Sequence, residues 1–311
     1  MTTTVTLTGT GTPVPSAGRA GASVLVRTEG LALQFDAGRA VTLRWADAGL
    51  SLRELTAVFL THHHSDHLTG LDDLLFSSWE LGGPNPLPVI APVGPAASFA
   101  RKLLENWSDD LEVRMSHVEA TLSGPASFDV QSFAVHTSPV EVWASGDVRV
   151  EAVAVHHEPV LPAVGYRVRT PSGNIAISGD TVVCAEVEKL AQGCAVLVHE
   201  VALRALRTQQ EPRLRRVAEY HADAQELGAL AQRAGVQVLV LTHLIPAPTT
   251  AEAEQQFTDE VRAGGFEGEL VVGRDLSTVL LTGPGQVPQL TPGITPAVAV
   301  DLSFKELAAV S

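Results

Sequence analysis

Short runs of alternating hydrophobic and polar residues, separated by glycine-rich and polar joints, make up the first sixty positions of the chain. Alternation with a period of two is typical of half-buried β-strands. The strands predicted in this region are residues 4–7, 23–27, 31–35 and 57–60. Apolar residues at helical spacing predict a helix over residues 39–49.

The rest of the chain alternates strands with helices. Helices are predicted over 71–79 and 96–107, and weak periodicity over 112–155 predicts short strands and loops. The later strands are predicted at 163–169, 175–177, 195–198, 236–241, 270–272 and 278–281, and the later helices at 185–191, 224–234 and 250–263. Strands alternating with helices in both halves indicate a layered α/β fold.

No linker rich in proline, glycine and serine divides this pattern, so a single domain is predicted over residues 1–283. Residues 284–311 contain four spaced prolines and predict an extended tail that ends in a short amphipathic helix over 302–310. The chain lacks a secretory signal pattern and any apolar stretch of about 18 residues, the length that spans a bilayer. These features predict a cytoplasmic protein without membrane contact.

Charge and cysteine content narrow the classes of partner. The chain has 21 Lys plus Arg against 35 Asp plus Glu, a formal net charge of −14. Such an acidic surface disfavours nucleic acid unless cations are concentrated locally. One cluster, Arg204, Arg207, Arg213, Arg215 and Arg216, is interpreted as a solvated face, with a polyanion site as the alternative. Cys184 and Cys194 are predicted to be buried free thiols.

The most specific motif is the run Leu60-Thr-His-His-His-Ser-Asp-His-Leu-Thr-Gly70. It lies between an apolar strand and an apolar helix, a position that a histidine-rich solvated loop does not explain. Imidazoles and a carboxylate are ligands that zinc prefers. His62 and His64, two residues apart at a strand end, can face one metal, and Asp66 and His67 can face a second.

Three later segments offer further ligands. Val155-His-His-Glu-Pro159 follows a strand and provides His156 or His157, and Ile177-Ser-Gly-Asp-Thr181 provides Asp180, which can bridge two ions. Val240-Leu-Thr-His-Leu244 repeats the strand-then-Thr-His order and provides His243. Each is weak alone, but together they occur in an order that one site would require.

This ligand series resembles the metallo-β-lactamase superfamily, and within it the ribonuclease Z and arylsulfatase-type branch. Leu7-Thr-Gly-Thr-Gly-Thr-Pro13, Phe35-Asp-Ala-Gly38 and Gly165-Tyr-Arg-Val168 resemble that branch too. The resemblance implies a four-layer αββα fold and two divalent metal ions, zinc or alternatively manganese. It assigns His62, His64 and His157 to one metal and Asp66, His67 and His243 to the other, with Asp180 bridging. His157 is preferred because relatives place this ligand directly before the turn that leads to Gly-Tyr-Arg.

The resemblance also implies catalytic roles. Asp66 would orient the attacking hydroxide, and His221 would protonate the leaving oxygen with Glu200 as its partner. Ribonuclease Z proteins carry the sequence His-Glu-Ala-Thr, whereas this chain has His199-Glu-Val-Ala202. Asp36 is expected to accept an imidazole N–H beside the metals. His63, His117 and His136 are interpreted as structural or surface residues.

The predicted substrate is a small ester: a phosphodiester, a sulfate ester or a carboxylic ester or lactone. Resemblance to ribonuclease Z implies an arm that grips tRNA, inserted between the third histidine ligand and the bridging aspartate. In this chain only 23 positions separate His157 from Asp180, too few for a protruding arm. A tRNA 3′-end endonuclease is therefore the alternative, and nucleic acid is not the expected partner. A redox or sensory metal protein is the alternative from another class, and a homodimer is the oligomeric state considered.

The 90 positions from His67 to His157 contain many of the aromatic residues. These are predicted either to roof a substrate pocket or to pack in the core. They are Phe76, Trp79, Phe99, Trp107, Phe128, Phe133 and Trp143.

Overall fold

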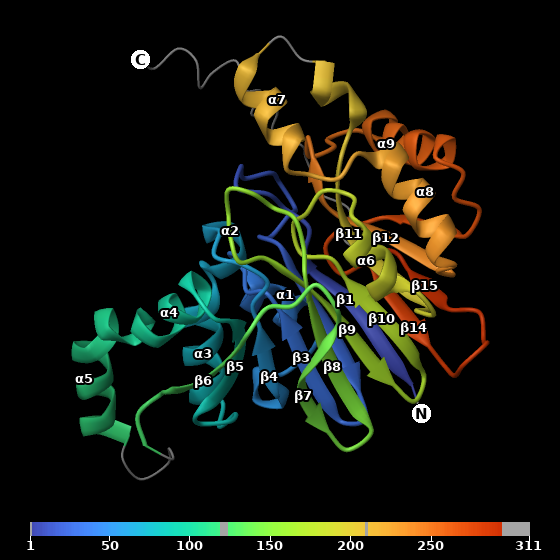
Figure 1. Ribbon diagram of the computed structural model, residues 1–311. Helices are drawn as coiled ribbons and strands as arrows, with labels where there is room; N and C mark the ends of the chain where they lie inside the picture. The colour runs from blue at the N-terminus through green and yellow to red at the C-terminus, as the bar shows by residue number, and fades with distance from the viewer. Residues whose placement is uncertain (1, 119–123, 209–210, 294–311) are drawn as a thin grey trace.

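Two mixed β-sheets lie face to face at the centre of the molecule, and helices cover the outer face of each sheet (Figure 1). The computed structural model describes residues 2–118, 124–208 and 211–293. The layers follow the order helix, sheet, sheet, helix, which confirms the predicted αββα fold.

The first sheet has eight strands among the described residues. In spatial order they are β15 (Gln289–Thr291), β14 (Thr278–Leu281), β1 (Thr3–Gly9), β2 (Ser23–Thr28), β3 (Leu31–Phe35), β4 (Ala57–Phe59), β5 (Leu87–Pro92) and β6 (Phe128–Phe133). Strands β3 to β6 are parallel, so their carboxyl ends meet at one edge of the sheet. Glu29 and Gly30, with φ of 50° and 76°, form the tight turn between β2 and β3.

The second sheet has seven strands in the described part of the chain. They are β13 (Glu269–Val272), β12 (Val238–Ile245), β11 (Val196–Ala202), β10 (Gly173–Ile177), β9 (Val164–Thr170), β8 (Val148–Ala154) and β7 (Val140–Ser145). Strands β10 to β13 are parallel and also end at a common edge. Loops at such an edge are where α/β proteins place their functional side chains.

Helices of the first half cover the first sheet, and helices of the second half cover the second. The first set comprises α1 (Val41–Asp47), η1 (Leu52–Glu54), α2 (Ser65–Leu68), α3 (Leu71–Glu80), α4 (Pro95–Lys102), η2 (Leu103–Trp107) and α5 (Ser108–Val118). The second comprises α6 (Ala185–Ala191), α8 (Ala224–Ala234) and α9 (Ala251–Ala263), while η3 (Arg204–Thr208) and α7 (Pro212–Glu219) connect β11 to α8 beyond the end of the sheets (Figure 1). Asp223 caps α8 by accepting from the amides of Gln225 and Glu226, and Gly235 ends it with φ of 69°.

The interface between the sheets is mainly aliphatic, since aromatic residues make up only 5% of the chain. Phe35, Phe59 and Tyr166 lie within it among valines, leucines and isoleucines. Tyr166, on β9 of the second sheet, donates its hydroxyl to the carbonyl of Leu60 in the first sheet at 2.6 Å. This bond joins the two sheets directly before His62, so sheet packing also fixes the start of the histidine motif.

Two predictions about secondary structure need correction. Residues 112–118, predicted as strands and loops, belong to helix α5. Asp109 and Asp110 favour a helix start there, and Leu111 and Met115 pack four residues apart against the helix-side core. Residues 289–291 of the predicted tail form β15, which pairs with β14.

The helix predicted over 302–310 lies outside the described residues. Among the residues that the structure does describe, none of the helices combines the length and apolar character that crossing a bilayer requires.

Candidate metal centre

Segments from both sheets bring the predicted ligands together at one end of the molecule. His62 and His64 follow β4, and Asp66 and His67 lie in the short helix α2. From the second sheet come His157 after β8, Asp180 after β10 and His243 in β12. All of these side chains except that of His64 are buried.

The first group consists of His62, His64, His157 and Asp180, whose ligand atoms all lie within 4.8 Å of one another. His157 Nε2 is 3.2 Å from His64 Nδ1 and 3.9 Å from Asp180 Oδ2. The structure places His157 in this group, whereas His156 is exposed and faces away.

The second group consists of Asp66, His67 and His243, with the same mutual spacing. His243 Nε2 lies 3.2 Å from Asp66 Oδ2. Asp180 Oδ2 is 3.3 Å from His67 Nε2 and 3.4 Å from His243 Nε2, so this oxygen adjoins both groups. The arrangement suits a carboxylate that bridges two cations.

Hydrogen bonds on the far side of the rings fix their orientation. Asp36 Oδ2 accepts from His67 Nδ1 and from the Thr61 hydroxyl, both at 2.7 Å. Thr61 Oγ1 lies 2.9 Å from His62 Nδ1, and the Tyr220 carbonyl accepts from His157 Nδ1 at 3.0 Å. Because the Nδ1 atoms of His62, His67 and His157 are hydrogen-bonded in this way, the Nε2 atom of each ring points into the site. Thr61 was not predicted, although the repeated Thr-His order is a signal for it.

Buried nitrogen atoms without hydrogen bonds show that the pocket fits metal ions. His62 Nε2 and His67 Nε2 face the centre of the site, and neither has a hydrogen-bond partner among the described residues. Leaving such atoms unsatisfied is costly, whereas a divalent cation would coordinate them. Histidine nitrogens and carboxylate oxygens are a donor set for zinc-class ions.

The charges in the site favour metal binding. Burial lowers the pKa of His62 well below its usual value and that of His64 to about 4, so both imidazoles are neutral. Burial alone would raise the pKa of Asp180, but His243 and His67 outweigh it and lower this pKa well below its usual value. Burial alone would lower the pKa of His67 and His243, but the nearby Asp180 carboxylate outweighs it and raises both, that of His67 well above its usual value. The site therefore combines the neutral imidazoles of His62 and His64 with an ionised carboxylate.

A second histidine–carboxylate pair adjoins the ligands. His221 Nδ1 donates to Glu200 Oε1 at 3.1 Å, and the same oxygen accepts from the amides of Thr181 and Ala222. A ring nitrogen of His221 lies within 4.8 Å of ligand atoms of Asp180 and His243. Glu200 thus holds His221 at the edge of the centre, with its second nitrogen available to a substrate.

The aromatic residues between His67 and His157 do not roof the site. Trp79 is buried in the helix-side core, where Phe76 and Phe128 also pack, and Phe133 and Trp143 pack between the sheets. Phe99 and Trp107 are exposed. The small cavity beside the ligands, about 30 Å³, is lined instead by Asp36, His67, Asp180, Glu200 and His243 among others. His117 and His136 are exposed and distant in sequence from every ligand.

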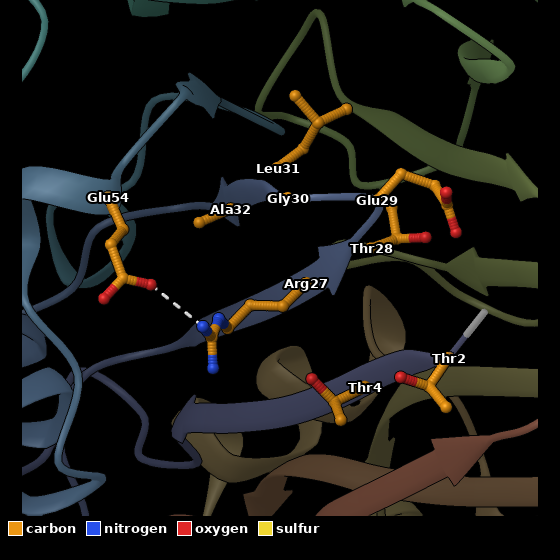
Figure 2. A pocket seen from close by; sticks show the side chains of 9 residues that line it. All are labelled: Thr2, Thr4, Arg27, Thr28, Glu29, Gly30, Leu31, Ala32 and Glu54. Atoms are coloured by element: carbon orange, nitrogen blue, oxygen red, sulfur yellow. Dashed lines mark hydrogen bonds and ion pairs between the residues drawn. The ribbon is translucent and has the colours of Figure 1, made fainter.

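A larger hollow than this cavity lies elsewhere on the molecule. It measures about 430 Å³ and surrounds the β2–β3 turn, at the opposite end of β3 from Asp36. Figure 2 shows that Arg27 and Glu54 form an ion pair across it, at 2.9 Å. Its other lining residues are Glu29, threonines and small or apolar side chains, a set without the histidines that gather at the metal centre.

Comparison with known proteins identifies the family. The family described as "Beta-lactamase superfamily domain" matches residues 29–244. A ribonuclease Z of Mycobacterium bovis is 36% identical over 279 residues, which cover 88% of this chain and 97% of that protein. A ribonuclease Z of Mycolicibacterium paratuberculosis is 38% identical over 284 residues, covering 90% and 99%. The chain belongs to the metallo-β-lactamase superfamily. These relatives place it in the ribonuclease Z branch, which confirms the resemblance read from its motifs.

Solved structures of metallo-β-lactamase proteins agree in fold. The Bacillus subtilis metallo-β-lactamase fold protein YhfI aligns with a TM-score of 0.68 at 19% identity, covering 90% of this chain and all of that one. The short form of human tRNase Z aligns with a TM-score of 0.63 at 21% identity, covering 92% and 100%. Membership in this superfamily makes the chain a metal-dependent hydrolase.

Asp180→Asn is expected to reduce bound metal more than the loss of any one histidine, because one carboxylate serves both groups and screens the repulsion between two cations. Elemental analysis after zinc loading should give more than one ion fewer per chain for the variant than for the native protein, whose centre should hold two ions. Asp129→Asn, an exposed aspartate on β6, is the matched control. An Asp180→Asn variant that retains as many ions as the native protein would refute the bridging role.

Gly38→Ala is expected to weaken metal binding through the backbone. A Cβ at Gly38 would clash with the backbone of Gly21 and with the carbonyl oxygen of Asp66, so the packing between the Gly21 segment, Gly38 and helix α2 has to change. Gly228→Ala crowds the Val261 carbonyl at 2.1 Å instead, far from the ligands. Both variants should lose about 1–3 kcal/mol of stability, but only Gly38→Ala should show weaker zinc affinity in a chelator competition. Equal affinities would contradict this account.

Proposed function

We propose that this protein is a zinc-dependent endonuclease that cleaves RNA phosphodiester bonds, with the 3′ end of precursor tRNA as its substrate. The observation that carries the proposal is similarity to ribonuclease Z proteins over nearly the full length of both chains. This similarity reverses the order of the two substrate hypotheses drawn from the sequence, and it favours hydrolysis over a redox or sensory role.

His62, His64 and His157 would hold one zinc ion, Asp66, His67 and His243 the other, and Asp180 both. When bound, the two ions would supply Lewis acidity and lower the pKa of a water molecule. Asp66 orients the attacking water and accepts its proton. As the new P–O bond forms and the P–O3′ bond breaks, His221 donates a proton to the departing oxygen. Glu200 holds the His221 ring in position by accepting a hydrogen bond from its Nδ1.

An arginine-rich segment supports an RNA substrate. η3 and α7 connect β11 to α8, and α7 stands out beyond the end of the sheets that carries the ligands (Figure 1). Arg204, Arg215 and Arg216 are exposed there. The segment leads into Tyr220, whose carbonyl accepts from the ligand His157. Cations beside the site can bind phosphates of a polyanion, so the alternative interpretation of this cluster is now preferred.

A second candidate is a hydrolase of small esters, as the sequence first predicted. The chain between His157 and Asp180 forms β9, a turn and β10, with no protruding arm. The net charge of −14 also disfavours RNA at long range. Direct assay has to decide between these substrates.

His221→Ala is expected to leave metal content unchanged and to lower turnover by about 10²–10⁴-fold, the range for loss of a general acid. The loss should be smaller for a nitrophenyl phosphodiester, because nitrophenolate leaves without a proton. Turnover of good and poor leaving groups should be compared with that of His136→Ala, an exposed-histidine control. Equal losses on both substrates would remove His221 from the acid role.

Arg215→Gln/Arg216→Gln is expected to weaken processing of precursor tRNA and to leave cleavage of a nitrophenyl phosphodiester unchanged. For each arginine that binds a phosphate, its removal should reduce the salt dependence of RNA affinity, log K against log [salt], by about one unit of slope. Arg53→Gln/Lys102→Gln removes the same charge from the other helical layer and should change neither.

The same assays separate the two candidates. Site-specific cleavage at the 3′ end of precursor tRNA, sensitive to the arginines, supports the endonuclease. Fast hydrolysis of small esters without RNA cleavage would establish the second candidate and refute the first.

A further inference from the structure

Outside the catalytic centre, three side chains of different kinds form a second cluster of metal-ligand type. They are His156, Cys184 and Glu186, whose ligand atoms lie within 4.8 Å of one another. His156 is exposed, and the other two are half-buried. The proposed reaction uses none of them.

Hydrogen bonds hold together the two segments that carry these residues. The His156 amide donates to Thr181 Oγ1 at 3.0 Å, and the His156 carbonyl accepts from the Val182 amide at 3.0 Å. Cys184 follows at the amino end of helix α6, whose first turn contains Glu186. The backbones are therefore fixed, and only side-chain rotations remain for the cluster to close around an ion.

The side chains are also oriented for ligation. His156 Nε2 lies 3.3 Å from Glu186 Oε2, while its Nδ1 lies 3.6 Å from Glu158 Oε1. Nε2 is the ring nitrogen beside Glu186, so it is the atom of His156 that can serve as a ligand together with that carboxylate. A tetrahedral zinc with bonds of about 2.0–2.3 Å needs ligand atoms about 3.3–3.8 Å apart, a small contraction of the present spacing.

We propose that His156, Cys184 and Glu186 bind a third divalent cation of the zinc class, with water as the fourth ligand. Imidazole, thiolate and carboxylate are together a zinc donor set. A surface ion pair between His156 and Glu186 is the simpler explanation of those two residues, but it gives no role to Cys184.

A cation in this position would stiffen the catalytic centre. His156 directly precedes the ligand His157, and the segment that leads to Cys184 directly follows the ligand Asp180. A tie between the two segments would hold a ligand of each at a fixed separation. The inference does not depend on which substrate the catalytic centre hydrolyses.

Cobalt(II) titration of the full-length protein tests the proposal. The catalytic ligands are nitrogen and oxygen atoms only, so a sulfur-to-cobalt charge-transfer band in the near ultraviolet reports on a cysteine. We expect this band to appear with a third equivalent of cobalt, to vanish in Cys184→Ser and to persist in Cys194→Ser. Burial raises the pKa of the Cys194 thiol to about 12, so Cys194 is a suitable matched control.

Two further variants distinguish a site formed by all three residues from a thiol that binds cobalt by itself. Glu186→Gln and His156→Ala should each lower the affinity for the third equivalent of cobalt by at least about tenfold, the scale of the effect when a metal site loses one of its partners. Two tightly bound ions in Cys184→Ser would show that this variant is folded. No band in the native protein, a band that survives Cys184→Ser, or one unaffected by both further variants would overturn the proposal.

Discussion

The centre depends on one buried oxygen atom. Asp180 Oδ2 lies within 3.9 Å of imidazole nitrogens from His62, His67, His157 and His243, which belong to separate segments of both sheets. An ionised carboxylate so deeply buried is stable only among compensating charges and donors. The two sheets must therefore meet in one register, and the aliphatic interface and the Tyr166–Leu60 bond maintain that register.

Two residues of the centre have a strained backbone. Asp36 and His243 both have positive φ, at 55° and 45°, although neither is glycine. Such conformations cost on the order of 1–3 kcal/mol each and persist because the neighbouring contacts fix them. At Asp36 these contacts are the hydrogen bonds that Thr61 and His67 donate to its carboxylate. The same bonds orient two of the histidine ligands. The strained backbone thus lowers the stability of the folded protein, but it holds the metal-binding donors in position in advance.

Local sequence patterns predicted the layers, most helices and strands, and the segments that meet at the centre. A ligand at a strand end has a recognisable context, as Thr61-His62 and Thr242-His243 show. Helix α5 was missed because its apolar face is short and its sequence is rich in charge. The cluster of His156, Cys184 and Glu186 has no local signal, since it exists only where two segments 25 or more positions apart meet.

The position of the arginines bears on how an acidic protein can bind RNA. Charges separated by more than about 8–10 Å are largely screened at physiological salt, so the net charge of −14 governs distant approach rather than contact. Phosphate binding requires cations within reach of the bound strand, whichever connection supplies them. The β9–β10 turn at Pro171 and Ser172 contains no cation, but the β11–α8 connection presents exposed arginines beside Tyr220 and His221. The absence of an arm between His157 and Asp180 is therefore weak evidence against the proposed RNA substrate. A basic segment leads into His221, the residue proposed as the general acid, from another part of the chain.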